Sequence, residues 1–479
     1  MKPSSSYQFA SINFAKQNLW ASALWVAGAA AAWAGPPGRD LAAGLPSQQA
    51  GKRAYEQYCA RCHGAQGRGD GVDAKRFYPR PRDLTLGVYK FRSTASGTPP
   101  TDDDLFETVT HGLPGSNMPD WQHLDEPTRR QLVYYLKSLS PVFERSAPEP
   151  VKTAADPGPK GADLAKGKAL YEKLGCAACH GASGRANGTS AAGLVDDWGM
   201  PIRPANLTQG WAYRGGSDPR AVMLRVLTGI DGAGMPSYAE AMSPEEGWQL
   251  AYYVASLQEP PHWNLIAHAR VAQGPLPDSL DDPRWTSAER TDVRVRNAVN
   301  ANGEWASPPT IKAVSFQAIR NEREIVFRFS WDDPTQDAQT PPDGLALVLK
   351  PAGVSGDVVT LQAWPYAGAP ALDLCYWSAK TQQAAEVVAR DVERVLAQQG
   401  SHTSLHSVAD YTDGRWRLLL QRPLHPDAPE GAAALTPELF GSVAFAVWDG
   451  GLPAAPGAAQ AGNPTARAVS PWVDLDLRK

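Results

Sequence analysis

Apolar residues recur every three or four positions in several stretches of the first half of the chain, which is the spacing of a helix with one buried face. The pattern predicts helices at Gln48–Tyr58, around Leu132–Leu139, at Asp163–Leu174 and around Leu250–Leu257. The last of these has a start signal, with Ser243 as N-cap, Pro244 at the first helical position and Glu246 at the third. Loop-rich chain joins these helices, so we expect an all-α first half.

Beyond about His262 the pattern changes to alternating or continuous apolar runs that end at Gly, Pro or Asp, and such runs predict β-strands. We expect strands at Glu324–Trp331, Leu345–Lys350, Val358–Trp364, Arg415–Gln421, Ser442–Gly450 and Trp472–Leu477. One stretch, Thr381–Gln399, has the composition of a helix. Residues 262–479 are therefore predicted to form a mainly antiparallel β-sandwich with one embedded helix.

The first half of the chain contains an internal duplication. The pattern Cys-x-x-Cys-His occurs at Cys59, Cys62 and His63, and again 117 positions later at Cys176, Cys179 and His180. The pair Met118-Pro119 returns at the same offset as Met235-Pro236, and "RPRDLT" (80–85) returns as "RPANLT" (203–208). We expect two copies of one helical domain, 45–141 and 162–260, joined by a Pro-rich, semi-extended polar linker at 142–161.

Cys-x-x-Cys-His indicates covalent attachment of haem c. The two thiols add across the vinyl groups of the porphyrin, and the adjacent histidine can reach the iron from the same side. Zinc would require two further soft ligands at each site, and neither copy contains another cysteine. The sequence therefore predicts two covalently bound haem c groups, held by Cys59, Cys62, Cys176 and Cys179, with His63 and His180 as axial ligands.

The second axial ligand is expected to be methionine, because thioether sulfur is common at the iron of electron carriers. Met118 and Met235 each lie 55 positions after the histidine of their copy. The other hydrogen-bonding nitrogen of each histidine needs an acceptor, and we expect a backbone carbonyl at Pro79 or Pro81 in one copy and at Ile202 or Pro204 in the other. Two arginines, Arg82 and Arg203, are candidates for contacts with the haem propionates.

Composition and the N-terminus point to an exported protein. The formal net charge is −4 and no basic block is present, so nothing favours nucleic acid as a partner. The apolar run Leu19–Ala34 has 16 residues, fewer than the ~20 that a membrane-spanning helix needs. It ends in Ala32-Trp33-Ala34, so we expect a signal peptide at 1–34, cleaved after Ala34, and a periplasmic mature chain without an integral membrane span. An uncleaved anchor is the alternative.

The two copies resemble class I c-type cytochromes. The resemblance rests on "CARCHG" and "CAACHG", on "MPDW" and "MPSY", and on the closing stretches "LVYYLKSL" and "LAYYVASL", and it covers residues 48–140 and 161–260. It implies two all-α haem domains that carry single electrons.

Three phrases in the C-terminal part resemble the haem-binding γ subunits of ethylbenzene-dehydrogenase-type molybdoenzymes: "FRFSWDDPT" (Phe327–Thr335), "VAFAVWDG" (Val443–Gly450) and "AVSPWVDL" (Ala468–Leu475). The resemblance implies a b-type haem between a methionine and a lysine. This chain departs from that pattern, since Arg467 stands at the lysine position and no methionine follows Met242. Arginine stays protonated and cannot ligate iron.

We therefore expect no haem b in residues 262–479. A haem b could be held there only by unusual ligands such as His402, His406 or Cys375. We expect Cys375 instead to be a buried free thiol.

These observations predict an exported di-haem cytochrome that transfers single electrons between a periplasmic, molybdenum-containing oxidoreductase and the respiratory chain. Its partners would be redox proteins. The chain itself should not be an enzyme, because two six-coordinate irons leave no open position for a substrate. The matched methionines also argue against a di-haem peroxidase, which needs one five-coordinate haem.

The alternative function is a cytochrome fused to a carbohydrate- or ligand-binding β-sandwich. Such a module would stack its ligand on exposed aromatic rings. The candidate residues are Trp331, Trp364, Trp377, Trp416, Trp448 and Trp472.

Overall fold

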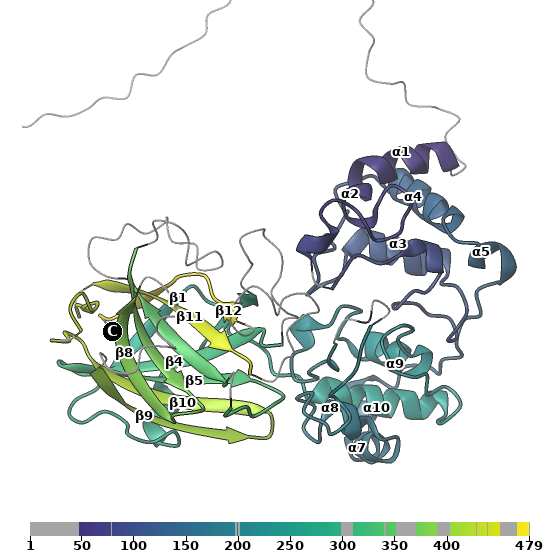
Figure 1. Cartoon of the computed structure of the whole chain (residues 1–479). Helices are drawn as coiled ribbons and strands as arrows, with labels where there is room; N and C mark the ends of the chain where they lie inside the picture. Colours follow the sequence, from purple (N-terminus) through teal and green to yellow (C-terminus); the bar gives the residue numbers. More distant parts are fainter. Residues whose placement is uncertain are drawn as a thin grey trace, which may run out of the picture. The chain divides into compact units, whose positions relative to one another are not determined.

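The computed structural model describes residues 47–77, 79–196, 199, 202–297, 310–339, 342–350, 370–389, 403–427, 429–437, 439–450 and 467–478. Along the chain they form two helical domains and then a β-domain (Figure 1). The predicted signal peptide at 1–34 and the predicted strand Val358–Trp364 lie outside these residues. Within the described ranges, no helix has the length and apolar character needed to cross a bilayer.

The duplicated helices are confirmed. The first copy contains α1 (Gln48–Tyr58), α2 (Ala60–His63), η1 (Ala74–Arg76), η2 (Leu84–Leu86), α3 (Asp102–His111) and α4 (Glu126–Ser138). The second contains α7 (Leu164–Lys173), α8 (Cys176–His180), η3 (Gly210–Ala212), α9 (Pro219–Thr228) and α10 (Pro244–Ser256). The predicted start of α10 is also correct, because Ser243 and Glu246 form a reciprocal capping box there.

A close crossing of the first and last helices organises each copy. A Cβ atom on Gly51 of α1 would lie 2.1 Å from the carbonyl oxygen of Gln131 in α4, and one on Gly167 of α7 would lie 2.2 Å from that of Gln249 in α10. Only glycine permits this approach, and it lets Tyr55 pack on Tyr135 with ring centroids 5.2 Å apart. Because α1 ends immediately before the first cysteine, the crossing also places the Cys-x-x-Cys-His segment.

Residues 142–161, expected as a semi-extended linker, contain the short helices α5 (Val142–Arg145) and α6 (Gly158–Gly161). The chain around them is bonded to both copies. Val151 N donates to Ser93 O (2.9 Å) in the first copy, and the indole N–H of Trp248 in α10 donates to Ala154 O (2.9 Å) in the second. This segment is therefore fixed along much of its length.

Two arginines connect the copies directly. The side chain of Arg92 is fully buried; it donates to the backbone oxygen of Thr228 (3.0 Å) and forms an ion pair with Asp231 (2.8 Å). From the other copy, Arg225 donates to Lys90 O (3.2 Å). These bonds give the buried guanidinium of Arg92 the partners that a buried cation requires.

The β-domain consists of β1 (Ile266–Val271), η4 (Pro283–Ser287), β2 (Thr291–Arg294), β3 (Arg296–Asn297), β4 (Ala313–Arg320), β5 (Glu324–Asp332), β6 (Gly344–Leu349), β7 (Leu372–Ser378), β8 (Gln383–Ala389), β9 (Thr403–Thr412), β10 (Arg415–Pro423), β11 (Phe440–Trp448), β12 (Arg467–Val469) and β13 (Val473–Asp476). Five of the six predicted strands are confirmed, and the sixth is the one outside the described residues.

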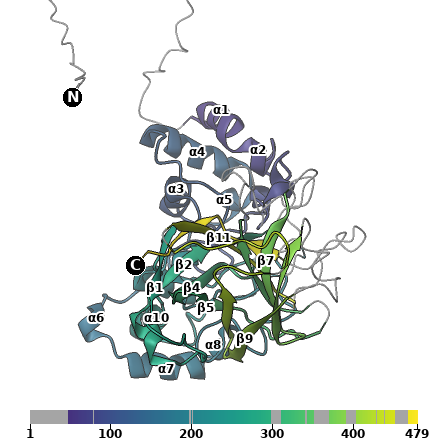
Figure 2. The ribbon, with the colours of Figure 1, turned by 90° about the vertical axis from the view of Figure 1, so that its left-hand side faces the viewer.

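The predicted sandwich needs a correction. Among the described strands, ten form a hydrogen-bonded ring in the order β13-β1-β4-β5-β10-β9-β8-β7-β6-β11, and β11 pairs back with β13. The pairs are antiparallel except that β1 is parallel to both β13 and β4. The domain is thus a barrel-like sheet rather than two separate layers (Figure 2), and closure removes the exposed edges that a sandwich would leave.

The helix predicted at Thr381–Gln399 is wrong over its described part. Gln383–Ala389 forms strand β8, which pairs with β7 on one side and with β9 on the other. The pairing places Ala384 and Glu386 in the interior, where both are at most 1% exposed. Helix propensity is a weak preference, and burial between two neighbouring strands outweighs it here.

Aromatic rings fill the interior of the ring of strands. Phe316 packs on Phe445 with centroids 4.9 Å apart, and Trp377 packs on Trp416 at 5.0 Å. Of the tryptophans considered for ligand stacking, Trp331, Trp377, Trp416 and Trp448 are at most 2% exposed and belong to the core. Trp472 is partly buried against a neighbouring core cluster, and Trp364 lies outside the described residues.

The helix crossing yields the first prediction. Gly51→Ala should destabilise the first copy by about 1–3 kcal/mol, because the added methyl group would overlap the Gln131 carbonyl and the helices would have to separate. Thermal or urea unfolding of the purified protein would measure the loss. Gln57→Ala, on the exposed side of α1, is the matched control and should change stability by less than about 0.5 kcal/mol. Equal effects of the two substitutions would contradict the packing argument.

Candidate haem sites

The two Cys-x-x-Cys-His segments form the short helices α2 and α8, and each ends at a glycine with φ of 82°, Gly64 and Gly181. The four cysteines are half-buried, and all are free thiols. Burial raises the pKa of Cys59 to about 12 and that of Cys176 to about 11.

A buried tyrosine fixes each of these segments. The hydroxyl of Tyr55 donates to Gly64 O (2.7 Å), and that of Tyr171 donates to Gly181 O (2.6 Å). The first helix of each copy is thereby bonded to the residue directly after the histidine. Sequence analysis missed this role, although "YE" precedes both cysteine pairs.

The two histidines have the same hydrogen-bond arrangement. Nδ1 of His63 lies 3.0 Å from Arg82 O, and Nδ1 of His180 lies 2.9 Å from Ala205 O. This bond assigns the proton to Nδ1 and leaves Nε2 as the nitrogen available to a metal. Burial lowers the pKa of both rings, which favours the neutral imidazole that ligation requires.

The predicted acceptors, Pro79 or Pro81 and Ile202 or Pro204, were wrong. The observed acceptors lie one residue after Pro81 and one residue after Pro204. The accepting carbonyl belongs to the residue immediately after the proline of "RPR" (80–82) and of "RPA" (203–205), that is, to Arg82 and Ala205. The expectation of a backbone acceptor in this segment was correct. Arg82 and Ala205 occupy the same place in "RPRDLT" (80–85) and "RPANLT" (203–208), so the sequence already contained a signal for both acceptors.

The methionines lie in turns that are held against the ends of α3 and α9. Leu113 N donates to Met118 O (3.1 Å), and Ile230 N donates to Met235 O (2.9 Å). Met235 packs in the same apolar cluster as Cys176, while Met118 is half-buried.

Each of these turns rests on a glycine that sequence analysis missed. Gly112 and Gly229 have φ of 62° and 68°, and a Cβ on them would lie 2.6 and 2.9 Å from the carbonyl oxygens of Met118 and Met235. They are 117 positions apart, the offset of the duplication.

The predicted propionate contacts fall in half-buried, polar surroundings. Burial lowers the pKa of the Arg82 guanidinium, which also faces Asp196. The Nε of Arg203 and the hydroxyl of Tyr89 are buried and find no hydrogen-bond partner among the described residues. A negatively charged group beside them would supply the missing acceptors, so these residues fit a haem carboxylate.

The expected buried free thiol at Cys375 is confirmed, and the structure also places several other methionines and histidines. Met223 and Met242 are core residues, Cys375 is a fully buried free thiol, and His111 and His406 are exposed. Met200 and His402 lie outside the described residues.

Family comparisons agree with this geometry. Residues 46–136 match the description "Cytochrome C oxidase, cbb3-type, subunit III", and residues 164–258 match "Cytochrome c". The chain contains two cytochrome c-type domains. Such domains carry covalent haem c, and Cys59/Cys62 and Cys176/Cys179 fit the attachment positions.

Curated relatives that match this chain include subunits of cbb3-type cytochrome c oxidases. The chain is 30% identical over 222 residues to the cbb3-type cytochrome c oxidase subunit CcoP of Azospirillum sp. (strain B510), covering 43% of this chain and 62% of that protein. It is 26% identical over 208 residues to the subunit FixP of Azorhizobium caulinodans, covering 43% and 58%. The chain thus spans about three fifths of the length of these relatives.

One solved structure is similar in sequence, a chain of the Kuenenia stuttgartiensis reducing HAO-like protein complex Kustc0457/Kustc0458. It is 43% identical, and the match covers 45% of this chain and all of that one with a TM-score of 0.43.

The methionine turns yield the second prediction. Gly229→Ala should displace Met235, because the new methyl group would meet the Met235 carbonyl and Ser237 N. We expect a large part of the second haem to become accessible to carbon monoxide in the reduced protein, as measured by its absorption spectrum.

The matched control for this prediction is Gly97→Ala. Gly97 also has a positive φ, 81°, but nothing lies within 4 Å of an added Cβ, so it shares the backbone strain of about 1 kcal/mol without the overlap. If carbon monoxide does not bind to Gly229→Ala, or binds equally to both variants, Gly229 does not hold the Met235 turn in place.

Proposed function

We propose that this chain is an exported two-haem cytochrome that passes single electrons between a periplasmic, molybdenum-containing oxidoreductase and the respiratory chain. The observation that carries the proposal is the duplicated site. Cysteines, histidine, carbonyl acceptor and methionine turn recur in the same local geometry in both copies.

The residues have separate tasks in each copy. Cys59 and Cys62 would hold the first porphyrin covalently, and Cys176 and Cys179 the second. His63 with Met118, and His180 with Met235, would be the axial ligands. A haem bound in this way supplies reversible one-electron chemistry.

The surrounding residues keep the ligand set in place. The carbonyls of Arg82 and Ala205 orient the histidines, and the close approach of Gly112 and Gly229 to the methionine turns would keep Met118 and Met235 in place as ligands. Arg82 and Arg203 would donate hydrogen bonds to the propionates. With both axial positions filled, no open site remains for a substrate, so the chain would act as a redox subunit and not as an enzyme.

The partner is inferred from the sequence. The phrases at Phe327–Thr335, Val443–Gly450 and Ala468–Leu475 resemble γ subunits of molybdoenzymes, and the curated relatives are subunits of a respiratory oxidase. The first resemblance supports a molybdoenzyme as one redox partner, and the second supports a component of the respiratory chain as the other. The arginine at position 467 supports a β-domain without a haem b, which would then serve in docking.

A pyridine haemochrome assay with iron and protein quantification tests the proposal. We expect two c-type haems and no b-type haem per chain. The double variants Cys59→Ala/Cys62→Ala and Cys176→Ala/Cys179→Ala should each keep one covalent haem, because each removes both attachment sites of one copy.

Cys375→Ala is the control for this assay and should keep both haems, since its thiol lies in the core of the β-domain. A wild-type chain with one covalent haem, or a double variant that keeps two, would overturn the assignment. A b-type signal would show that the β-domain is itself a redox centre.

A further inference from the structure

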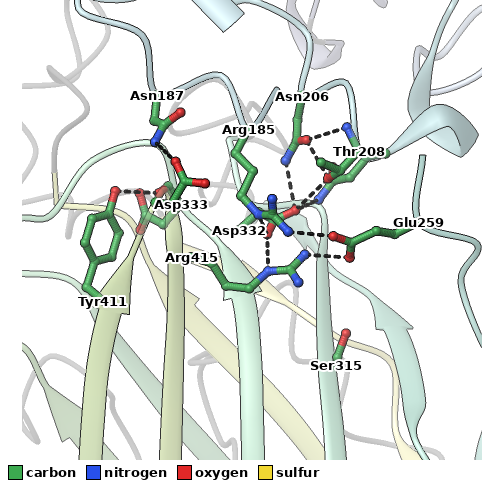
Figure 3. A network of polar contacts seen from close by, with 12 residues as sticks. Arg185, Asn187, Asn206, Thr208, Glu259, Ser315, Asp332, Asp333, Tyr411 and Arg415 are labelled. Carbon is green, nitrogen blue, oxygen red and sulfur yellow. Dashed lines mark hydrogen bonds and ion pairs between the residues drawn. The ribbon is translucent and has the colours of Figure 1, made fainter. Parts of the chain in front are cut away.

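A buried carboxylate of the β-domain contacts the second cytochrome copy (Figure 3). Asp332, at the end of β5, has a side chain that is 6% exposed. Its Oδ2 accepts from Asn206 Nδ2 (2.9 Å) and from Gln209 Nε2 (3.0 Å), and its Oδ1 accepts from Arg415 Nε (2.6 Å). Two of these three donors belong to the cytochrome copy.

Charges in this network are balanced. Arg185 of the cytochrome copy lies 3.4 Å from Asp332, and Arg185 and Arg415 both pair with Glu259, at 2.5 and 2.8 Å. Burial opposes ionisation of Asp332, yet the two arginines hold its pKa below the ordinary value. Two carboxylates and two guanidinium groups therefore alternate, and Asp332 is an anion at neutral pH.

One peptide unit, between Ala205 and Asn206, separates this network from the hydrogen bond of His180. Asn206 directly follows Ala205, whose carbonyl accepts from His180 Nδ1 (2.9 Å). The Oδ1 of Asn206 also accepts from Thr208 N (3.0 Å) and Oγ1 (2.7 Å), so the side chain is held on two sides. A fixed Asn206 fixes the peptide plane that presents the Ala205 carbonyl.

The first copy shows what the loop does without this contact. Asp83 stands in place of Asn206 and makes the same local turn, accepting from Thr85 N (2.9 Å) and Oγ1 (2.6 Å). An aspartate has no N–H to offer and would repel Asp332. Arg68 and Leu86, the counterparts of Arg185 and Gln209, are exposed in the first copy.

We propose that Asp332 is a positioning residue for the second haem site. Through Asn206 it fixes the Ala205 carbonyl on His180, so that the β-domain sets the reduction potential of the second haem and not that of the first. A well-held acceptor on Nδ1–H makes the imidazole a stronger donor to iron and stabilises the oxidised state. The inference rests on the proposed function, since it requires haem at both sites.

The test compares three variants of the full chain by optical redox titration. The Cys59→Ala/Cys62→Ala variant identifies the wave of the second haem. Asp332→Asn removes the charged acceptor, and Asn206→Ala removes all three hydrogen bonds of the loop side chain without changing the charge. We expect each to raise the ratio of reduced to oxidised second haem at fixed potential by about fivefold, the size of one lost hydrogen bond. The wave of the first haem should stay in place.

Glu259→Gln is the control for charge. It removes one negative charge from the same network, keeps an acceptor for Arg415, and makes no side-chain bond to Asn206. A shift as large as that of Asp332→Asn would show that charge alone sets the potential. Unchanged waves in both Asp332→Asn and Asn206→Ala would also overturn the inference.

Haem content, measured on the same samples, separates this inference from the proposed function. Two haems per chain with unmoved waves would refute only the role of Asp332. Fewer than two haems in the wild-type chain would refute both.

Discussion

The hydrogen bond from each proximal histidine to a backbone carbonyl is the constraint on which the rest of the cytochrome half depends. It selects the tautomer, leaves Nε2 available and connects two segments that are 19 residues apart in the first copy and 25 in the second. Most other features of each copy hold the two ends of this bond. The helix crossing at glycine and the buried tyrosine place the helix that bears the histidine. The turn that follows Pro81 in one copy and Pro204 in the other places the carbonyl.

The two copies share this hydrogen bond but differ in the residue that follows the accepting carbonyl. Both copies keep the helix crossing, the tyrosine bond and the glycine under the methionine turn. The replacement of Asp83 by Asn206 at the corresponding position changes what the loop can bind, because an amide can donate to a carboxylate and a carboxylate cannot. One copy can therefore dock on the acidic end of β5, and the other leaves the equivalent residues in solvent.

The sequence could predict the parts that are encoded locally. Cys-x-x-Cys-His is contiguous because the two thiols would attach to one haem and the adjacent histidine would reach the iron of the same haem, and the capping box of α10 is read from four successive residues. The prediction of β8 as a helix was wrong because its neighbours β7 and β9 decide its conformation. Closure of the ring of strands also depends on non-local pairing, between β11 and β13 and between β1 and two parallel neighbours. Asp332 and Asn206 are 126 residues apart, and no local pattern announces their contact.

The proposed function requires that the exported chain carry two covalently attached haems. The most direct measurement is the intact mass of the protein purified from the periplasm under denaturing conditions, which retain only covalent groups. We expect the mass of residues 35–479 plus two haems. A mass that corresponds to no haem or to one haem would contradict it.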